Sequence, residues 1–168
     1  MSLTTREVWE AMEGSIFGVL AFVNRNGEPR SAGVCYVIDG SSLLISSGVD
    51  SWKVRHIERN PKVSMTITVP KHIPFLPFIK VPAATITFQG EAEILRVTDV
   101  DSLVVARLLR GLDLGRHAVE DTRLIQVTPR GDFVTYGIGM PLMQMRKVDQ
   151  ARGRAPCGIT RETASTQV

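Results

Sequence analysis

Short β-prone segments separated by turn residues recur along most of this chain, and they limit what it can fold into. Two of them, residues 15–23 and 29–38, flank an Asn26-Gly27 pair, which is the strongest short-range signal of a β-hairpin. An Asp39-Gly40 pair then leads into a third apolar segment, residues 43–45. We expect these three strands to pair antiparallel in the order of the sequence, as a meander.

Four more segments of this kind follow, at residues 63–69, 84–97, 124–127 and 133–136. Gly90 lies inside the longest of them and predicts a bulge or a sharp bend. About six to seven antiparallel strands with a few short helices predict a mainly β fold with peripheral helices. We expect the sheet to close, fully or nearly, into a barrel, because closure removes exposed strand edges.

Helix signals are few and short. Thr4 and Glu7 have the spacing of a capping box, which predicts a helix from there to about Glu13. A second helix is expected to begin at Asp50 or Ser51 and to end before Pro61, because proline disfavours helical geometry in the residue before it. A third is expected from about residue 98, with Gly111 as its C-cap.

Composition and charge narrow the class of protein. The apolar content is 43% and the charged content 22%, over a length that suits one domain of 168 residues. No window approaches the length of a membrane span, and no signal peptide is visible, so we expect a cytoplasmic protein that binds neither membranes nor nucleic acid. Residues 146–168 hold the whole net charge of +3. We therefore expect a single domain over residues 1–145 and a basic, partly disordered tail after it.

Cysteine and histidine give no sign of a metal site. Cys35 and Cys157 are far apart in the sequence, and the histidines at positions 56, 72 and 117 are scattered. Neither a zinc spacing nor a disulfide framework is present, so we predict no metal centre.

The stretch from residue 42 to residue 69 resembles a phosphate cradle. An apolar strand ends in Ser46 and Ser47, a glycine follows, and a helix then starts near Ser51 with Lys53 in its first turn. A helix N-terminus offers unpaired N–H groups and the positive end of the helix dipole, and the hydroxyls and the ammonium add donors. The alternative is that Asp50 or Ser51 only caps the helix and that Lys53 is solvated.

Two further segments are apolar but irregular. Residues 70–82 contain four prolines, which exclude a central strand or a helix. Residues 137–145 are rich in glycine and methionine. Both are candidates for lining a substrate pocket or for contacting a partner subunit, and the alternative is that they pack on their own domain.

Over residues 4–127 the chain resembles the flavin-binding split-barrel superfamily, which includes pyridoxamine 5′-phosphate oxidases and deazaflavin-dependent reductases. The resemblance rests on the order and spacing of several motifs: residues 18–21 (GVLA), 26–30 (NGEPR), 44–47 (LISS), 51–53 (SWK), 59–63 (RNPKV) and 88–92 (FQGEA). It implies a split β-barrel of the FMN-binding type.

The resemblance also implies a cofactor, FMN or alternatively a deazaflavin, and a homodimer with the cofactor site at the subunit interface. The cofactor phosphate would lie at the loop before Lys53, with an arginine of the second strand reaching it, and the isoalloxazine would lie along residues 31–34. A glutamine that contacts the ring in the oxidases falls near Thr85. The implied cofactor-binding residues are Arg30, Ser31, Ala32, Gly33, Ser46, Ser47, Ser51, Trp52, Lys53 and Thr85.

The expected activity is hydride transfer to a small, unidentified substrate, and no catalytic side chain is evident. Tyr36 and Tyr136 are weak candidates for a proton donor. Trp52 replaces an arginine found in many oxidases, and no tryptophan follows it, so a pyridoxamine phosphate oxidase is not expected. The alternatives are a non-catalytic flavin carrier, a haem-binding protein that uses His56 or His72, and a barrel without a cofactor.

Overall fold

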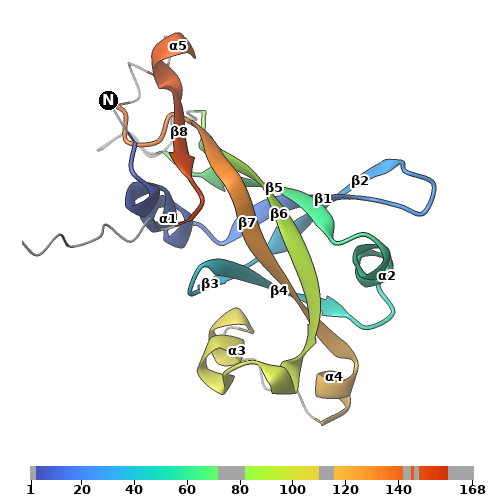
Figure 1. Ribbon diagram of the computed structural model, residues 1–168. Coiled ribbons are helices and arrows are strands. Elements are labelled where there is room, and N and C mark those ends of the chain that lie inside the picture. Colours follow the sequence, from blue (N-terminus) through green and yellow to red (C-terminus); the bar gives the residue numbers. More distant parts are fainter. Residues whose placement is uncertain (1–2, 72–81, 110–115, 142–144, 146–147, 159–168) are drawn as a thin grey trace, which may run out of the picture.

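Eight antiparallel strands form one curled sheet in the computed structural model, which describes residues 3–71, 82–109, 116–141, 145 and 148–158. Helices cover its ends and edges (Figure 1). The strands are β1 (Phe17–Val23), β2 (Pro29–Cys35), β3 (Val37–Asp39), β4 (Ser42–Gly48), β5 (Lys62–Val69), β6 (Ala84–Arg96), β7 (Thr122–Tyr136) and β8 (Arg152–Pro156). The helices are α1 (Thr5–Glu13), α2 (Trp52–Arg59), the 3₁₀ turn η1 (Val97–Asp99), α3 (Ser102–Leu108), α4 (Arg116–Glu120) and α5 (Val148–Ala151).

The strand order is β2-β1-β5-β6-β7-β4-β3, with β8 added on β7. The two hairpins, β1–β2 and β3–β4, form at the predicted turns, where Gly27 and Gly40 have positive φ. The predicted second strand, residues 29–38, is broken at Tyr36 into β2, which pairs with β1, and β3, which pairs with β4, so the predicted meander is interrupted there. At Tyr36 the chain turns away from β2, and the Tyr36 N–H donates to the Ile16 carbonyl. On its other side β4 pairs with β7.

The sheet curls so that β2, at one edge, approaches β4, the strand next to the other edge, without hydrogen bonding to it. The fold is therefore mainly β, a split barrel with peripheral helices, as predicted. Its core is made by the inward-facing residues of the strands, among them Leu20, Met65 and Ile86, which are fully buried. Buried residues of α1 and α2 cover the two ends of this core.

Strand β7 is one continuous strand, whereas two strands, residues 124–127 and 133–136, were predicted. Pro129 lies opposite Gly90, where the two backbones approach closely. A Cβ on Gly90 would lie 2.8 Å from the Thr128 carbonyl oxygen. The register of β6 against β7 shifts between Thr87 and Gln89, so the predicted irregularity near Gly90 is present.

Helix boundaries agree with the local signals except near residue 98. Thr4 and Glu7 form the predicted capping box, and Ser51 is the N-cap of α2. The single helix expected from residue 98 is η1 followed by a separate α3, capped by Asp101. Gly111, the predicted C-cap, lies outside the described residues, and no described helix is long and apolar enough to cross a membrane.

Strand β8 was not predicted and lies in the segment expected to be tail. It pairs with β7 from Asp132 to Tyr136, and Ala155 and Cys157 are buried. The Thr5 hydroxyl donates to the Pro156 carbonyl at 2.8 Å, so α1 and β8 lie side by side. Residues 159–168, the rest of the predicted tail, lie outside the described residues.

Candidate functional site

The predicted phosphate cradle is built by the turn between β4 and α2. Ser47 is buried, and its hydroxyl lies 2.8 Å from the Ser51 hydroxyl. Ser51 Oγ accepts a hydrogen bond from Val54 N at 3.3 Å, so the capping interpretation is correct for Ser51. Ser46 is exposed and, because side chains alternate along a strand, lies on the opposite face of β4 from Ser47, so it is not brought together with Ser47 and Ser51. Capping uses one N–H of the first turn, and such a turn has several without intrahelical acceptors, which an anion can accept from.

Trp52 and Lys53 open the helix beside this turn. The Trp52 ring packs on Phe22 of β1, with 5.2 Å between ring centroids, and its side chain remains 42% exposed. The Lys53 ammonium lies 5.8 Å from the Trp52 ring centroid. The first turn of α2 therefore presents an accessible aromatic ring and a cation at the same place.

Arg30 lies on β2 directly opposite Phe22. Directly opposed residues of an antiparallel pair share a face of the sheet, so Arg30 is on the face where Phe22 meets Trp52. Its Nη2 pairs with Glu28 Oε2 at 3.2 Å, and the Asn24 side-chain amide donates to the same oxygen at 2.7 Å. The other guanidinium N–H groups have no acceptor among the described residues, and an Arg has five N–H donors in all.

The predicted ring platform on β2 is divided between two faces. Ala32 lies on the inner face with Arg30, whereas Ser31 and Gly33 face outward, because side chains alternate along a strand. A Cβ on Gly33 would lie 3.0 Å from the Phe17 ring. The space that Gly33 leaves is therefore taken by Phe17, whose side chain is 46% exposed.

Thr85 is not brought together with the cradle. It lies on β6, paired with Thr68 and Tyr136, and two strands, β1 and β5, separate it from β2. With Tyr136, Arg152 and Arg154 it lines a separate cavity of about 430 Å³.

Both candidate proton donors hydrogen-bond to the backbone. The Tyr36 hydroxyl donates to the Met12 carbonyl at 2.7 Å, and burial raises the pKa of Tyr36 to about 12. The Tyr136 hydroxyl donates to the Met145 carbonyl, also at 2.7 Å. Both tyrosines thus have structural partners. The Met145 bond and the burial of Gly137 hold the described part of the 137–145 segment on the domain.

Three features of this region were not predicted from the sequence: the Phe22–Trp52–His56 aromatic cluster, the Asn24–Glu28–Arg30 contacts, and two arginines, Arg25 on the β1–β2 hairpin and Arg59 at the end of α2. The His56 ring lies 6.2 Å from Phe22 and 6.3 Å from Trp52, centroid to centroid. Positions 52, 56 and 59 share one helix face, a spacing that could have been read from the sequence.

Residues 72–81, which include His72 and most of the proline-rich segment, lie outside the described residues. Within the described parts of the chain, no three histidine, cysteine or acidic side chains come together as metal ligands. Cys35 is exposed and Cys157 is buried, and both are free thiols.

Comparisons with known proteins agree with this fold. The sequence profile of a family described as pyridoxamine 5′-phosphate oxidase matches residues 4–131. No curated protein matches the sequence.

Solved structures share the fold, and three of them illustrate the likeness. An F420 reductase is 24% identical, with a TM-score of 0.54 over 74% of this chain and 93% of that chain. General Stress Protein 26 from Bacillus anthracis is 23% identical, with a TM-score of 0.53 over 79% and 91%. HutZ, a heme storage protein from Vibrio cholerae, is 20% identical, with a TM-score of 0.61 over 83% and 98%.

Proposed function

This chain belongs to the pyridoxamine 5′-phosphate oxidase family, and we propose that it is a flavin-dependent oxidoreductase that binds FMN. The observation that carries the proposal is the β4–α2 turn, where the Ser47 and Ser51 hydroxyls lie 2.8 Å apart at the N-terminus of α2 and Lys53 follows in the first turn, with Arg30 on the β1–β2 hairpin. A phosphate monoester has nearly two negative charges and three acceptor oxygens, which suits this set of donors.

Each residue of the site has a distinct role in the proposal. Lys53 supplies a mobile charge, the first turn of α2 supplies N–H donors, and Arg30 supplies its unpaired guanidinium N–H groups. Glu28 accepts hydrogen bonds from both the Asn24 amide and the Arg30 guanidinium. These two bonds limit the directions in which the guanidinium can point. Bound flavin would supply the hydride chemistry, while the protein orients it and excludes water.

Trp52 and Phe17 are the accessible aromatic rings nearest to the proposed cofactor site. Trp52 removes a positive charge where many oxidases have arginine, and it offers a flat surface instead. Phe17 covers Gly33, so a ring stacked along Ser31 and Gly33 requires Phe17 to rotate away or to contact the ring. Trp52 and the lack of any later tryptophan, as differences from the oxidases, favour a substrate other than pyridoxamine phosphate.

The proposal includes a cytoplasmic homodimer with the cofactor between subunits. Phe17 and Val134 are apolar residues on the outer face of the sheet, and their side chains are 46% and 42% exposed. A second subunit that covers this face would also cover Ser31 and Gly33. Apolar patches of this kind are typical of protein interfaces.

Titration of the purified protein with FMN, followed by flavin fluorescence, tests the proposal. We expect Lys53→Ala or Arg30→Ala to weaken FMN binding by about 1.5–3 kcal/mol, which is typical of a hydrogen bond to a charged group. Arg55→Ala is the matched control, since Arg55 is exposed on the same helix. If the Lys53→Ala and Arg30→Ala proteins give the same titration curve as the Arg55→Ala control, there is no phosphate site at these residues.

The absorption spectrum separates the other candidate functions on this fold. Release of a yellow chromophore on denaturation supports a flavin, and a strong Soret band supports haem. Tighter binding of a deazaflavin than of FMN selects the deazaflavin-dependent reductase. If the protein binds flavin but reduces no substrate when a hydride donor is supplied, it is a non-catalytic carrier. A colourless protein that binds no flavin contradicts the proposal.

A further inference from the structure

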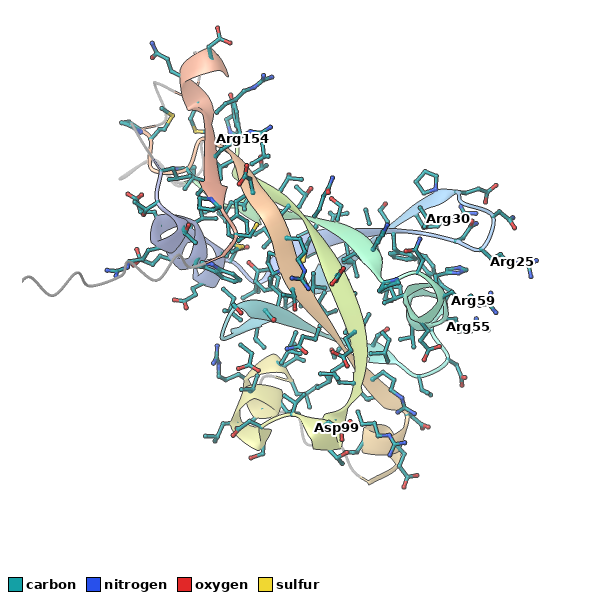
Figure 2. The ribbon with its side chains drawn as sticks, in the orientation of Figure 1. Arg25, Arg30, Arg55, Arg59, Asp99 and Arg154 are labelled. Atoms are coloured by element: carbon teal, nitrogen blue, oxygen red, sulfur yellow. The ribbon has the colours of Figure 1, made fainter. Side chains whose placement is uncertain are left out.

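A cavity of about 380 Å³ lies between the β1–β2 hairpin and the second half of α2. Its polar lining comes from Asn24 and Arg25 of the hairpin and from His56, Arg59 and Asn60 at the helix end. No carboxylate lines it. Figure 2 shows Arg25 and Arg59 at the same end of the molecule, together with Arg30 and Arg55.

The two chain segments that form this cavity are strongly positive. Residues 24–30 and 52–62 contain six basic side chains (Arg25, Arg30, Lys53, Arg55, Arg59 and Lys62) against two acidic ones (Glu28 and Glu58). The resulting +4 exceeds the net charge of the whole chain, +3. Among the described residues, neither Arg25 nor Arg59 has an ion-pair partner within 4 Å, and Glu28 is already held by Arg30 and Asn24.

Two neutral polar side chains at the helix end complete the lining of the cavity. The His56 Nδ1 atom is buried without a hydrogen-bond partner among the described residues, and such buried nitrogens nearly always have one. Asn60 Oδ1 accepts from Lys62 N at 3.1 Å, which leaves the Asn60 Nδ2 amide as a donor. Two guanidiniums, an imidazole and an amide therefore line one cavity that contains no acidic side chain.

The helix dipole accounts for only part of this arrangement. A cation in the last turn of a helix, such as Arg59, is favoured by the negative end of the dipole whether or not a ligand binds. The dipole gives no reason for Arg25, which lies on the hairpin and repels Arg59 across the cavity. An anion between the two guanidiniums would turn this repulsion into attraction.

We propose that this cavity is a second anion site, which takes a phosphate or carboxylate group and is separate from the cofactor phosphate cradle. Helix α2 joins the two sites, with the cradle at Trp52 and the cavity at Arg59. Seven residues of helix separate these positions by about 10 Å. One ligand with two well-separated anionic groups could fill both sites, or a free anion could fill the second one.

Thermal unfolding with inorganic phosphate at constant ionic strength tests the site. The background is Lys53→Ala, which weakens the cradle. In this background we expect phosphate still to raise the Tm. Adding Arg59→Gln should raise the phosphate concentration needed for the same Tm shift about tenfold or more, as for the loss of one charge-assisted hydrogen bond. Adding Arg55→Gln, on the same helix but outside the cavity lining, should leave it unchanged.

Arg25→Gln gives a second, independent test, and it should have the same effect as Arg59→Gln. Equal phosphate responses in the Arg59→Gln and Arg55→Gln proteins would overturn the proposal, as would the absence of any phosphate response in the Lys53→Ala background. The proposed FMN site is tested separately: it is contradicted if Lys53→Ala and Arg30→Ala leave the affinity for FMN unchanged.

Affinities for FMN and for FAD distinguish the two sources of the anion. FAD extends the flavin phosphate by a second phosphate and an adenosine. If the cavity holds part of an extended cofactor, Arg59→Gln should lower the affinity for FAD and leave that for FMN unchanged. If it holds a free anion, Arg59→Gln should change neither, and phosphate should raise the Tm of the FMN-loaded wild-type protein.

Discussion

The Tyr36 side chain links α1 to the strands below it. Its hydroxyl donates to the last turn of α1 at the Met12 carbonyl, and its ring is buried in the core, with 3% of the residue exposed. Burial penalises the phenolate form, which is why the pKa of Tyr36 is raised to about 12. Tyr36 therefore contributes to stability and has no free hydroxyl for chemistry.

Tyr36→Phe should lower the free energy of unfolding by about 1 kcal/mol near pH 8, because one buried hydrogen bond is lost. An unfolded tyrosine ionises near pH 10. The contribution of Tyr36 is therefore complete below about pH 10 and disappears as the pH rises towards 12. Urea unfolding of both proteins at several pH values measures this. The difference between wild type and variant should shrink above pH 10, and a constant difference would contradict the assignment.

Site residues with local signals could be predicted from the sequence. Ser51, Lys53 and the two serines of the cradle follow one another along a strand–turn–helix pattern, so their proximity is set by the chain itself. The packing of Trp52 on Phe22 joins α2 to a strand some thirty residues earlier. The cavity at Arg25 and Arg59 depends on the same contact between distant segments, and for this reason it was missed.

At the scale of elements, the long pair β6 and β7 forms the centre of the sheet (Figure 1). The pair spans both halves of the barrel, and Gly90 lies where its two backbones are closest. A Cβ at this position would lie against the Thr128 carbonyl, so the two strands can stay this close only with glycine at position 90.

Gly90→Ala should therefore destabilise the protein by about 1–3 kcal/mol, the cost of forcing an extra methyl into a packed site. Gly48→Ala is the control, because a Cβ on Gly48 would meet nothing within 4 Å. Denaturant midpoints of the two variants provide the measurement. Equal midpoints would mean that β7 can move away from β6 at little cost.

The elements themselves were largely predictable, while their pairing was not. The Asn26-Gly27 and Asp39-Gly40 pairs identify both hairpins from short-range sequence alone, and both glycines have the positive φ that such turns need. The pairing of β4 with β7 joins segments about eighty residues apart, and no local pattern records it. The strand β8 is short and rich in arginine and glycine, so neither periodicity nor β-propensity indicated it.

At the scale of the whole molecule, the outer face of the sheet is where a second subunit is proposed to bind. Phe17→Asp should raise the dimer dissociation constant at least about tenfold, because a charge would enter an apolar contact. Leu103→Asp is the control. Leu103 is 74% exposed on α3, away from this face. Sedimentation equilibrium of the two variants tests this, and a dimer equally stable in both would exclude Phe17 from the interface.

The strand order also has a consequence for how the chain is made. The β3–β4 hairpin is complete once residue 48 has been synthesised, yet β4 acquires its second neighbour only with β7, which begins at Thr122. On the ribosome this hairpin must therefore wait, with one edge open, while more than seventy further residues emerge. Long-range closures of this kind slow folding and expose strand edges to other chains. Synthesis rate and chaperone supply should thus govern the yield of this protein more than the stability of its finished barrel.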